Sequence, residues 1–177
     1  TPVVIQILII YNLLPSLFNS IIKSAGWNIN VFDINPIIYA FIVFSINASA
    51  SLSEIFRSAL LTVNKGQLEA ALSIGMSPVQ AYTRIIIPQA LVTAIPNICN
   101  LTISIIKGTS LAFMMTVKEV TAIAKIAASY GYNYIEAYLD ILIIYIILCS
   151  LIQFIFGWLE KHLGSYRILT GAPVKAN

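Results

Sequence analysis

Charge is scarce in this sequence, and its scarcity excludes most classes of soluble protein. Only 10% of the 177 residues are Asp, Glu, Lys or Arg, 59% are hydrophobic, and the mean hydropathy is +0.89. A soluble globular domain carries about 25% charged residues. The ten basic residues are scattered and the net charge is only +3, so no footprint for nucleic acid is present. The composition indicates a chain that lies in lipid.

Residues that build catalytic and metal sites are also rare. Cys99 and Cys149 lie in apolar runs without CxxC spacing, and we interpret both as core residues. The lone His162 stands beside Lys161 at the end of the last apolar stretch, a place for a solvated or headgroup-facing residue. The sequence has no Ser-His-Asp set, no metal-ligand cluster and no Gly-rich phosphate loop, so we predict no catalytic residues and no cofactor on this chain. Nothing in it is typical of the charged rings or filter carbonyls of an ion channel.

Four apolar stretches are each long enough to cross a bilayer. A hydrocarbon core of about 30 Å takes about 20 apolar helical residues, and backbone in lipid must form its hydrogen bonds internally. The four predicted spans are residues 1–22, 34–53 (continuing past Glu54), 85–106 and 137–159. A fifth segment, 110–130, holds Lys118, Glu119 and Lys125, so we expect an interfacial or re-entrant helix that does not cross.

The distribution of basic residues predicts the orientation of the chain. Cytoplasmic loops of membrane proteins carry an excess of Lys and Arg. The loop after the second span and the C-terminal tail together hold six of the ten, namely Arg57, Lys65, Arg84, Lys161, Arg167 and Lys175. The other side holds Lys23, Lys107, Lys118 and Lys125. Loop 56–84 and the tail are therefore predicted to be cytoplasmic.

The loop between the second and third spans begins with the pattern of a short capped helix. Asn64 is a good N-cap, and Gln67 three residues later predicts a capping box. The helix 65–74 is expected to end at Gly75, which takes the left-handed C′ conformation without strain. We expect the small residues of this helix and its end, Ala70, Ala71 and Gly75, to be exposed, so that the surface of a partner could approach the backbone closely.

A second capped helix is predicted directly after the first. Ser77 is its N-cap, Pro78 suits its first turn, and Gln80 again stands at the third position. This helix runs towards Pro88, whose missing amide is expected to bend the chain into the next span. The residues alone leave two interpretations open: a rigid docking block, or an ordinary helical hairpin.

The spacing of this loop resembles the EAA loop in the permease subunits of ABC importers. The pattern is Glu-Ala-Ala, three residues, Gly, nine residues, then Ile-x-Leu-Pro. This chain matches it at Glu69, Ala70, Ala71, Gly75, Ile85 and Pro88. Ile87 stands where Leu is usual, which keeps the apolar character. The resemblance implies that these positions dock into a cytoplasmic ATPase and couple its cycle to transport.

Three further segments resemble the polar amino-acid permeases within that family. They are Ser-Glu-Ile-Phe-Arg at 53–57, Lys-Gly-Gln at 65–67, and Lys-Gly-Thr-Ser-Leu at 107–111, where most members have Asp in place of Gly108. Residues 73–76, 109–113 and 159–161 look most like those of L-cystine importers. The implied cargo is thus L-cystine, and the alternatives are glutamine or glutamate, arginine or histidine, or another small solute. Importers of sugar, phosphate or metal are the nearest competing branches.

The resemblance also implies the fold. It implies an all-α integral membrane protein with the type I ABC importer permease fold, as one domain over 1–177 that includes the coupling loop 64–88. About four transmembrane helices are expected here and five in the full family chain. The opening Thr1-Pro2 is similar to the end of the family's Arg-Gly-Thr-Pro segment, so we expect that one N-terminal helix is missing.

Polar residues within two of the spans indicate a path for solute. At membrane depth such side chains mark either helix packing or a functional site. The candidates for a path are Asn47, Ser51, Asn97, Asn100 and Ser104. Interhelical hydrogen bonding is the alternative for each residue taken singly. Similar positions contact the amino acid in the family that the chain resembles.

Two further positions bear on cargo and gating. Leu101 stands where many members of the family carry an acidic residue, which argues against a cationic cargo and suits a zwitterion. Glu54 and Arg57 are three residues apart, close enough to pair on a helix, and we interpret them as a structural or gating pair. Lys118 and Glu119 are expected on an outer face, where a binding protein could land.

The resemblance implies the partners as well. They are a second permease subunit (identical or different), two cytoplasmic ATPases that bind ATP and Mg²⁺, and an extracytoplasmic substrate-binding protein, with no nucleic acid. The implied location is a bacterial cell membrane. In this hypothesis, closure of the ATPases pulls on residues 69–88 and switches the spans between two states.

Overall fold

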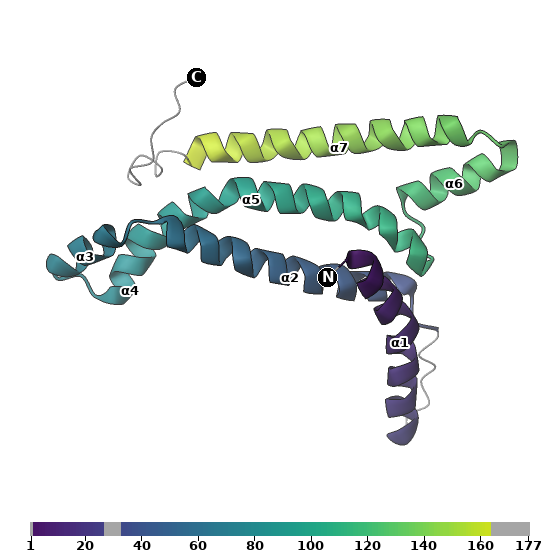
Figure 1. Ribbon diagram of the computed structural model, residues 1–177, viewed down its shortest axis with the longest axis horizontal. Helices are drawn as coiled ribbons and strands as arrows, with labels where there is room; N and C mark the ends of the chain where they lie inside the picture. The colour runs from purple at the N-terminus through teal and green to yellow at the C-terminus, as the bar shows by residue number, and fades with distance from the viewer. Residues whose placement is uncertain (1, 27–32, 164–177) are drawn as a thin grey trace. The chain divides into compact units, whose positions relative to one another are not determined.

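The computed structural model describes residues 2–26 and 33–163, and the elements in these ranges are helical (Figure 1). Of the predicted cytoplasmic tail, Lys161 lies in the last turn of the final helix, whereas Arg167 and Lys175 lie outside the described residues, as does Thr1.

Four helical stretches are long and apolar enough to cross a membrane, which confirms the four predicted spans. They are α1 (Val3–Ser24), α2 (Pro36–Thr62), a continuous stretch Pro78–Met115 that includes α5 (Ile87–Gly108), and α7 (Tyr134–Leu163). Helix α2 continues past Glu54, as expected. The remaining elements are α3 (Lys65–Ser73), α4 (Pro78–Ala81), a π-helical turn (Tyr82–Ile86), a 3₁₀ turn (Thr109–Met115) and α6 (Val120–Gly131). With 12 residues, α6 is too short to span a bilayer, as predicted for that segment.

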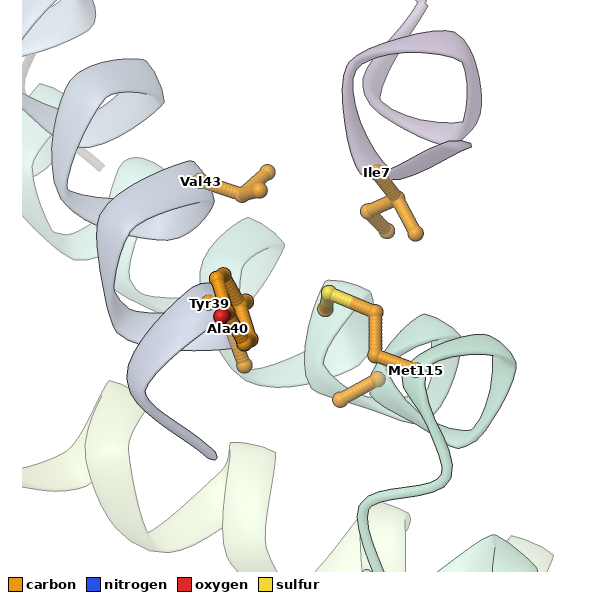
Figure 2. Packing of buried hydrophobic residues seen from close by; sticks show 6 residues of the cluster. Ile7, Tyr39, Ala40, Val43 and Met115 are labelled. Atoms are coloured by element: carbon orange, nitrogen blue, oxygen red, sulfur yellow. The ribbon is translucent and has the colours of Figure 1, made fainter. Parts of the chain in front are cut away.

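The chain divides into two compact units, residues 1–49 with 104–148 and residues 50–103 with 149–177. The first unit packs the start of α2 and the 3₁₀ turn against α1. Its buried core is Ile7, Tyr39, Ala40, Val43, Ala112 and Met115, of which five are labelled in Figure 2. The Tyr11 ring meets Tyr39 edge-on at 6.0 Å, and its hydroxyl lies 3.2 Å from Thr116 Oγ1.

Glu119 lies in this first unit and acts as the N-cap of α6. Its carboxylate accepts the backbone N–H groups of Thr121 and Ala122, each at 2.7 Å. Its two oxygens satisfy amides that would otherwise be unpaired at the start of the helix, a role that the sequence analysis did not foresee. The expectation that Glu119 lies on an outer face stays a prediction. Lys118 is exposed, as expected.

The second unit joins the end of α2 to the start of α5 through small side chains. Its buried cluster is Ala59, Val63, Ile86, Ala90 and Ala94. Alanines at this seam let two helices approach closely, which suits packing in lipid, where small residues favour helix contact. Helices α3 and α4 lie at the end of this pair (Figure 1), so the loop between the spans is attached to a packed stem.

Candidate functional site

The loop starts from a capped helix end. Asn64 is the N-cap of α3, and its Oδ1 accepts the Gly66 N–H at 2.8 Å. The prediction placed this bond at Gln67 as part of a capping box. In the structure the cap is made one residue earlier, and Gln67 Oε1 accepts a hydrogen bond from Gln89.

Helix α3 turns one face inward and one outward. Glu69 and Ala70 are exposed, whereas Ala71 is only 3% exposed. The expectation that Ala71 would be exposed is wrong. It lies one turn after Leu68, which packs against the seam of α2 and α5, so both residues fall on the inner face of α3. The outward surface of this helix is therefore narrower than its small-residue pattern suggested.

Gly75 ends α3 in the predicted conformation. Its φ is +85°, its N–H bonds to Leu72 O at 3.0 Å, and the next amide, of Met76, bonds to Ala71 O at 3.1 Å. These two bonds form a Schellman motif with glycine at C′. A Cβ built on Gly75 would meet no atom within 4 Å. The backbone at this corner is thus open to the outside.

Helix α4 carries the predicted capping box. Ser77 Oγ accepts the Gln80 N–H at 3.3 Å, and Gln80 Oε1 accepts the Ser77 N–H at 3.0 Å. Pro78 occupies the first turn, where its missing N–H leaves no bond unmade. Ala81 is fully buried at the end of this helix.

A π-helical turn carries the chain from α4 into α5. The Ile87 N–H bonds to Tyr82 O, five residues back, over the turn Tyr82–Ile86. In an α-helix, Pro88 would clash with the carbonyl of Arg84 and leave it without a donor. The wider turn accommodates the proline, and Figure 1 shows the chain turning from α4 into α5 through this segment. Ile85 is half-buried against the seam of α2 and α5, and Pro88 is also half-buried.

One contact in this region links α3 directly to α5. Gln89 Nε2 donates to Gln67 Oε1, 22 residues earlier, and to Ile85 O at 3.0 Å. Gln89 is only 2% exposed. Sequence reasoning missed Gln89 altogether. The available signal was a lone amide near the start of a charge-free span, but its partner is too distant in sequence to be inferred from spacing.

The predicted path residues are distributed over both units. Asn47 (half-buried) and Ser104 (exposed) belong to the first, whereas Ser51 (half-buried), Asn97 and Asn100 (both exposed) belong to the second. Their assignment to a solute path stays a prediction.

One of these residues, Asn100, lines a cavity within the second unit. It has a volume of about 180 Å³ between α5 and the end of α7. Its lining residues are Ile95, Pro96, Cys99, Asn100, Gln153, Phe156, Gly157 and Glu160. Asn100 thus lies at a hollow with the amide of Gln153 and the carboxylate of Glu160, neither of which was predicted to line a solute path.

Glu54 and Arg57 form the expected ion pair on α2. Arg57 Nε donates to Glu54 Oε2 at 2.8 Å, and its Nη2 bonds to the other carboxylate oxygen. Both side chains are more than 60% exposed in the isolated chain. Within residues 2–26 and 33–163, no group of three or more His, Cys, Asp or Glu residues is placed to hold a metal ion.

Comparison with known proteins finds similarity to membrane components of transport systems. Residues 1–165 match the profile of a family described as "Binding-protein-dependent transport system inner membrane component". The chain is 42% identical over 163 residues to the probable amino-acid permease protein YxeN of Bacillus subtilis, covering 92% of this chain and 68% of the relative. It is 34% identical over 172 residues to the L-cystine transport system permease protein TcyL of the same organism, covering 96% and 70%.

Two further similarities are to a glutamine permease and to a solved transporter structure. The glutamine transport system permease protein GlnP of Escherichia coli is 31% identical over 163 residues, covering 92% of this chain and 69% of the relative. A crystal structure described as an amino acid ABC transporter with histidines superposes with a TM-score of 0.74 at 30% identity, over 92% of this chain and 70% of the solved one.

Proposed function

Because this chain belongs to the family of binding-protein-dependent transport system inner membrane components, we propose that it is the permease subunit of an ATP-binding-cassette importer for a polar amino acid. It is a transport component rather than an enzyme. Four helices of spanning length and relatives that are amino-acid permeases support the proposal.

The observation that carries it is the block of residues 64–88. Its two short helices are held by an N-cap on each and by a Schellman motif between them, so it is stiff. Its outer surface offers the carboxylate of Glu69, the small side chain of Ala70 and the open backbone at Gly75. We propose that a cytoplasmic ATPase, which itself binds ATP and Mg²⁺, holds the block there, and that Ala71, Ile85 and Pro88 support it from inside.

The proposed cycle has two states. Two permease subunits form the path, a binding protein delivers the amino acid on the outer side, and closure of two ATPases moves the 64–88 blocks. In this scheme the 64–88 block and the C-terminal tail face the cytoplasm. Nucleotide drives the change because it is bound more tightly in one state than in the other.

L-cystine is the proposed cargo. Two L-cystine permeases of Bacillus subtilis, TcyL and TcyB, are among the relatives, at 34% and 36% identity. Leu101 adds no carboxylate next to Asn100, which suits a zwitterion better than a cation. Relatives also include glutamine and octopine permeases, so these two amino acids are the competitors to test.

Uptake in reconstituted vesicles tests the function and the cargo together. The complete importer, with its ATPase and binding protein, is placed in proteoliposomes with ATP inside, and labelled L-cystine is added outside with unlabelled competitors. ATP-dependent uptake blocked by excess L-cystine but not by glutamine or octopine supports both claims. Preferential block by glutamine or octopine replaces the cargo and keeps the permease. No ATP-dependent uptake of these three, or of glutamate, arginine or histidine, each also supplied as the labelled species, rejects the proposed function.

A further inference from the structure

We propose that Gln67 and Gln89 form an amide bridge that transmits movement of the docking helix α3 to the membrane helix α5. The inference rests on the proposed function, because it assigns a role in coupling to two residues outside the matched positions of the loop. The bridge is the hydrogen bond from Gln89 Nε2 to Gln67 Oε1.

The direction of this hydrogen bond is set by a third group. Gln89 Nε2 also donates to the backbone carbonyl of Ile85 at 3.0 Å, and a carbonyl can only accept. The nitrogen of Gln89 therefore faces the bridge, and Gln67 must present its oxygen. Gln89 is the donor and Gln67 the acceptor.

The burial of Gln89 argues that the bridge does more than stabilise the fold. Among the residues that the structure describes, Gln89 is the only buried side chain that carries an amide or a charge. Its Oε1 is buried without a hydrogen-bond partner in the described structure. Such an orphaned acceptor lowers stability, and an apolar side chain of similar volume would avoid the loss. An amide at this position is explained by the direction that it imposes on α3.

The bridge gives α3 and α5 a directional contact, which their apolar contact does not provide. Leu68 of α3 packs against the cluster that includes Ile86 and Ala90, and apolar contacts of this kind are not directional. A hydrogen bond between two amides weakens steeply when its angle changes. Because α3 carries the exposed Glu69 and Ala70, force applied there reaches the start of α5 through a contact with one preferred geometry.

The test compares two chemically identical changes at the two ends of the bridge. Gln67→Glu keeps an acceptor oxygen opposite Gln89 Nε2, whereas Gln89→Glu replaces the donor by a carboxylate that faces the Ile85 carbonyl. Gln67→Met, Gln89→Met and the double variant remove the bridge at nearly constant volume. Thr93→Val is the matched control, because the Thr93 hydroxyl of the same helix donates only back to Gln89 O, within α5. Each variant is assayed as the complete importer in proteoliposomes.

The main readout is the number of labelled cargo molecules imported per ATP hydrolysed, using the cargo that the wild type imports in the uptake assay above. We expect the ratio to fall about two- to tenfold in each Met variant, the range for one lost hydrogen bond. The double variant falls no further than the worse single one, because both changes remove the same interaction. Gln67→Glu and Thr93→Val keep the wild-type ratio, and Gln89→Glu loses it.

Three results would overturn the bridge. They are a wild-type ratio in both Met variants, losses that multiply in the double variant, and equal effects of the two Glu substitutions. A purely structural role lowers the unfolding temperature of the complex and leaves the ratio unchanged.

If the variants at Gln89 fail to fold, the comparison of Gln67→Met with Gln67→Glu decides, since Gln67 is only half-buried on α3. A wild type that imports nothing rejects the proposed function itself, and the bridge with it.

Discussion

Ser77 and Gln80 each bond the backbone amide of the other, at 3.3 and 3.0 Å. The helix that they begin is four residues long before the π-helical turn, and it is the free outer end of the continuous stretch Pro78–Met115. The reciprocal cap thus helps to hold this end, at the outer corner of the 64–88 block, against fraying, and it provides the first prediction.

Replacing Ser77 by Ala removes one half of this cap. Loss of an N-cap hydroxyl typically costs about 1 kcal/mol, so α4 should open more often. Hydrogen exchange of the amides of residues 79–82 should speed up about fivefold, as that free energy implies. Ser73→Ala is the control, because its hydroxyl bonds within α3, to Glu69 O. Equal exchange in the Ser77 and Ser73 variants would contradict the role given to the cap.

Substitution of Gly75 separates strain from docking. At φ +85° an Ala side chain costs about 1–2 kcal/mol, whereas Asn tolerates this conformation better. A Cβ there touches nothing in this chain, so Gly75→Asn and Gly75→Trp should insert and fold. We expect both to lose uptake and binding-protein-stimulated ATPase activity, with Trp the more severe, because the side chain lies where the ATPase is proposed to dock.

Gly26 offers a matched control for this prediction. It also has a positive φ (+75°) and open space around its Cβ, but it follows α1 in the other unit. Gly26→Asn and Gly26→Trp should retain uptake. Coupled uptake at the wild-type level in Gly75→Trp would end the docking proposal.

The ion pair of Glu54 and Arg57 is tested by exchange of charges. Glu54→Gln and Arg57→Gln each break the pair, which is exposed in the isolated chain. If the pair gates or braces the path, each single variant lowers the rate of uptake. The swap Glu54→Arg with Arg57→Glu restores most of the rate, since the three-residue spacing on α2 is kept. A swap as impaired as the single variants would assign the effect to the position of a charge rather than to the pair.

Asn100 should affect recognition of the cargo. Asn100→Leu removes an amide from the cavity between α5 and α7. The KM for import is expected to rise about two- to tenfold, as for one lost hydrogen bond, with the ATPase activity of the complex without cargo unchanged. Asn12→Leu is the control, because that amide donates within α1, to Leu8 O. An unchanged KM in Asn100→Leu would remove this residue from the path.

The sequence predicted those features that depend on local chemistry. The spans follow from apolar length, Gly75 from its conformational freedom, and the cap at Ser77 from a spacing of three residues. All three are confirmed. The inward face of Ala71 could not be foreseen, because small side chains suit both a docking surface and a packed one. Only the position of Leu68 against the seam of α2 and α5 decides between them.

The contacts missed in the sequence join residues whose distance along the chain carries no signal. The bridge between Gln67 and Gln89 spans a whole helix–turn–helix, and Gln67 had a plausible local role beside Asn64. The capping role of Glu119 was not predicted, because a capping residue and a solvated one look alike when the start of the helix is not known. The sequence alone does not tell which distant side chains pair, or at which residue each helix begins.

The π-helical turn at Tyr82–Ile86 has a consequence for how this loop tolerates change in length. It holds one residue more than an α-helical turn would, and each residue of an α-helix advances the direction of its side chains by about 100°. Deleting one residue there would change by about 100° the direction in which α4 leaves α5. The bonds inside α4 could survive, but the Gln67–Gln89 bridge and the packing of Leu68 against the seam of α2 and α5 could not keep their geometry, and Glu69 and Gly75 would point elsewhere. The direction in which the loop faces is therefore set by the number of residues in this turn, and a substitution that keeps this number changes the direction little.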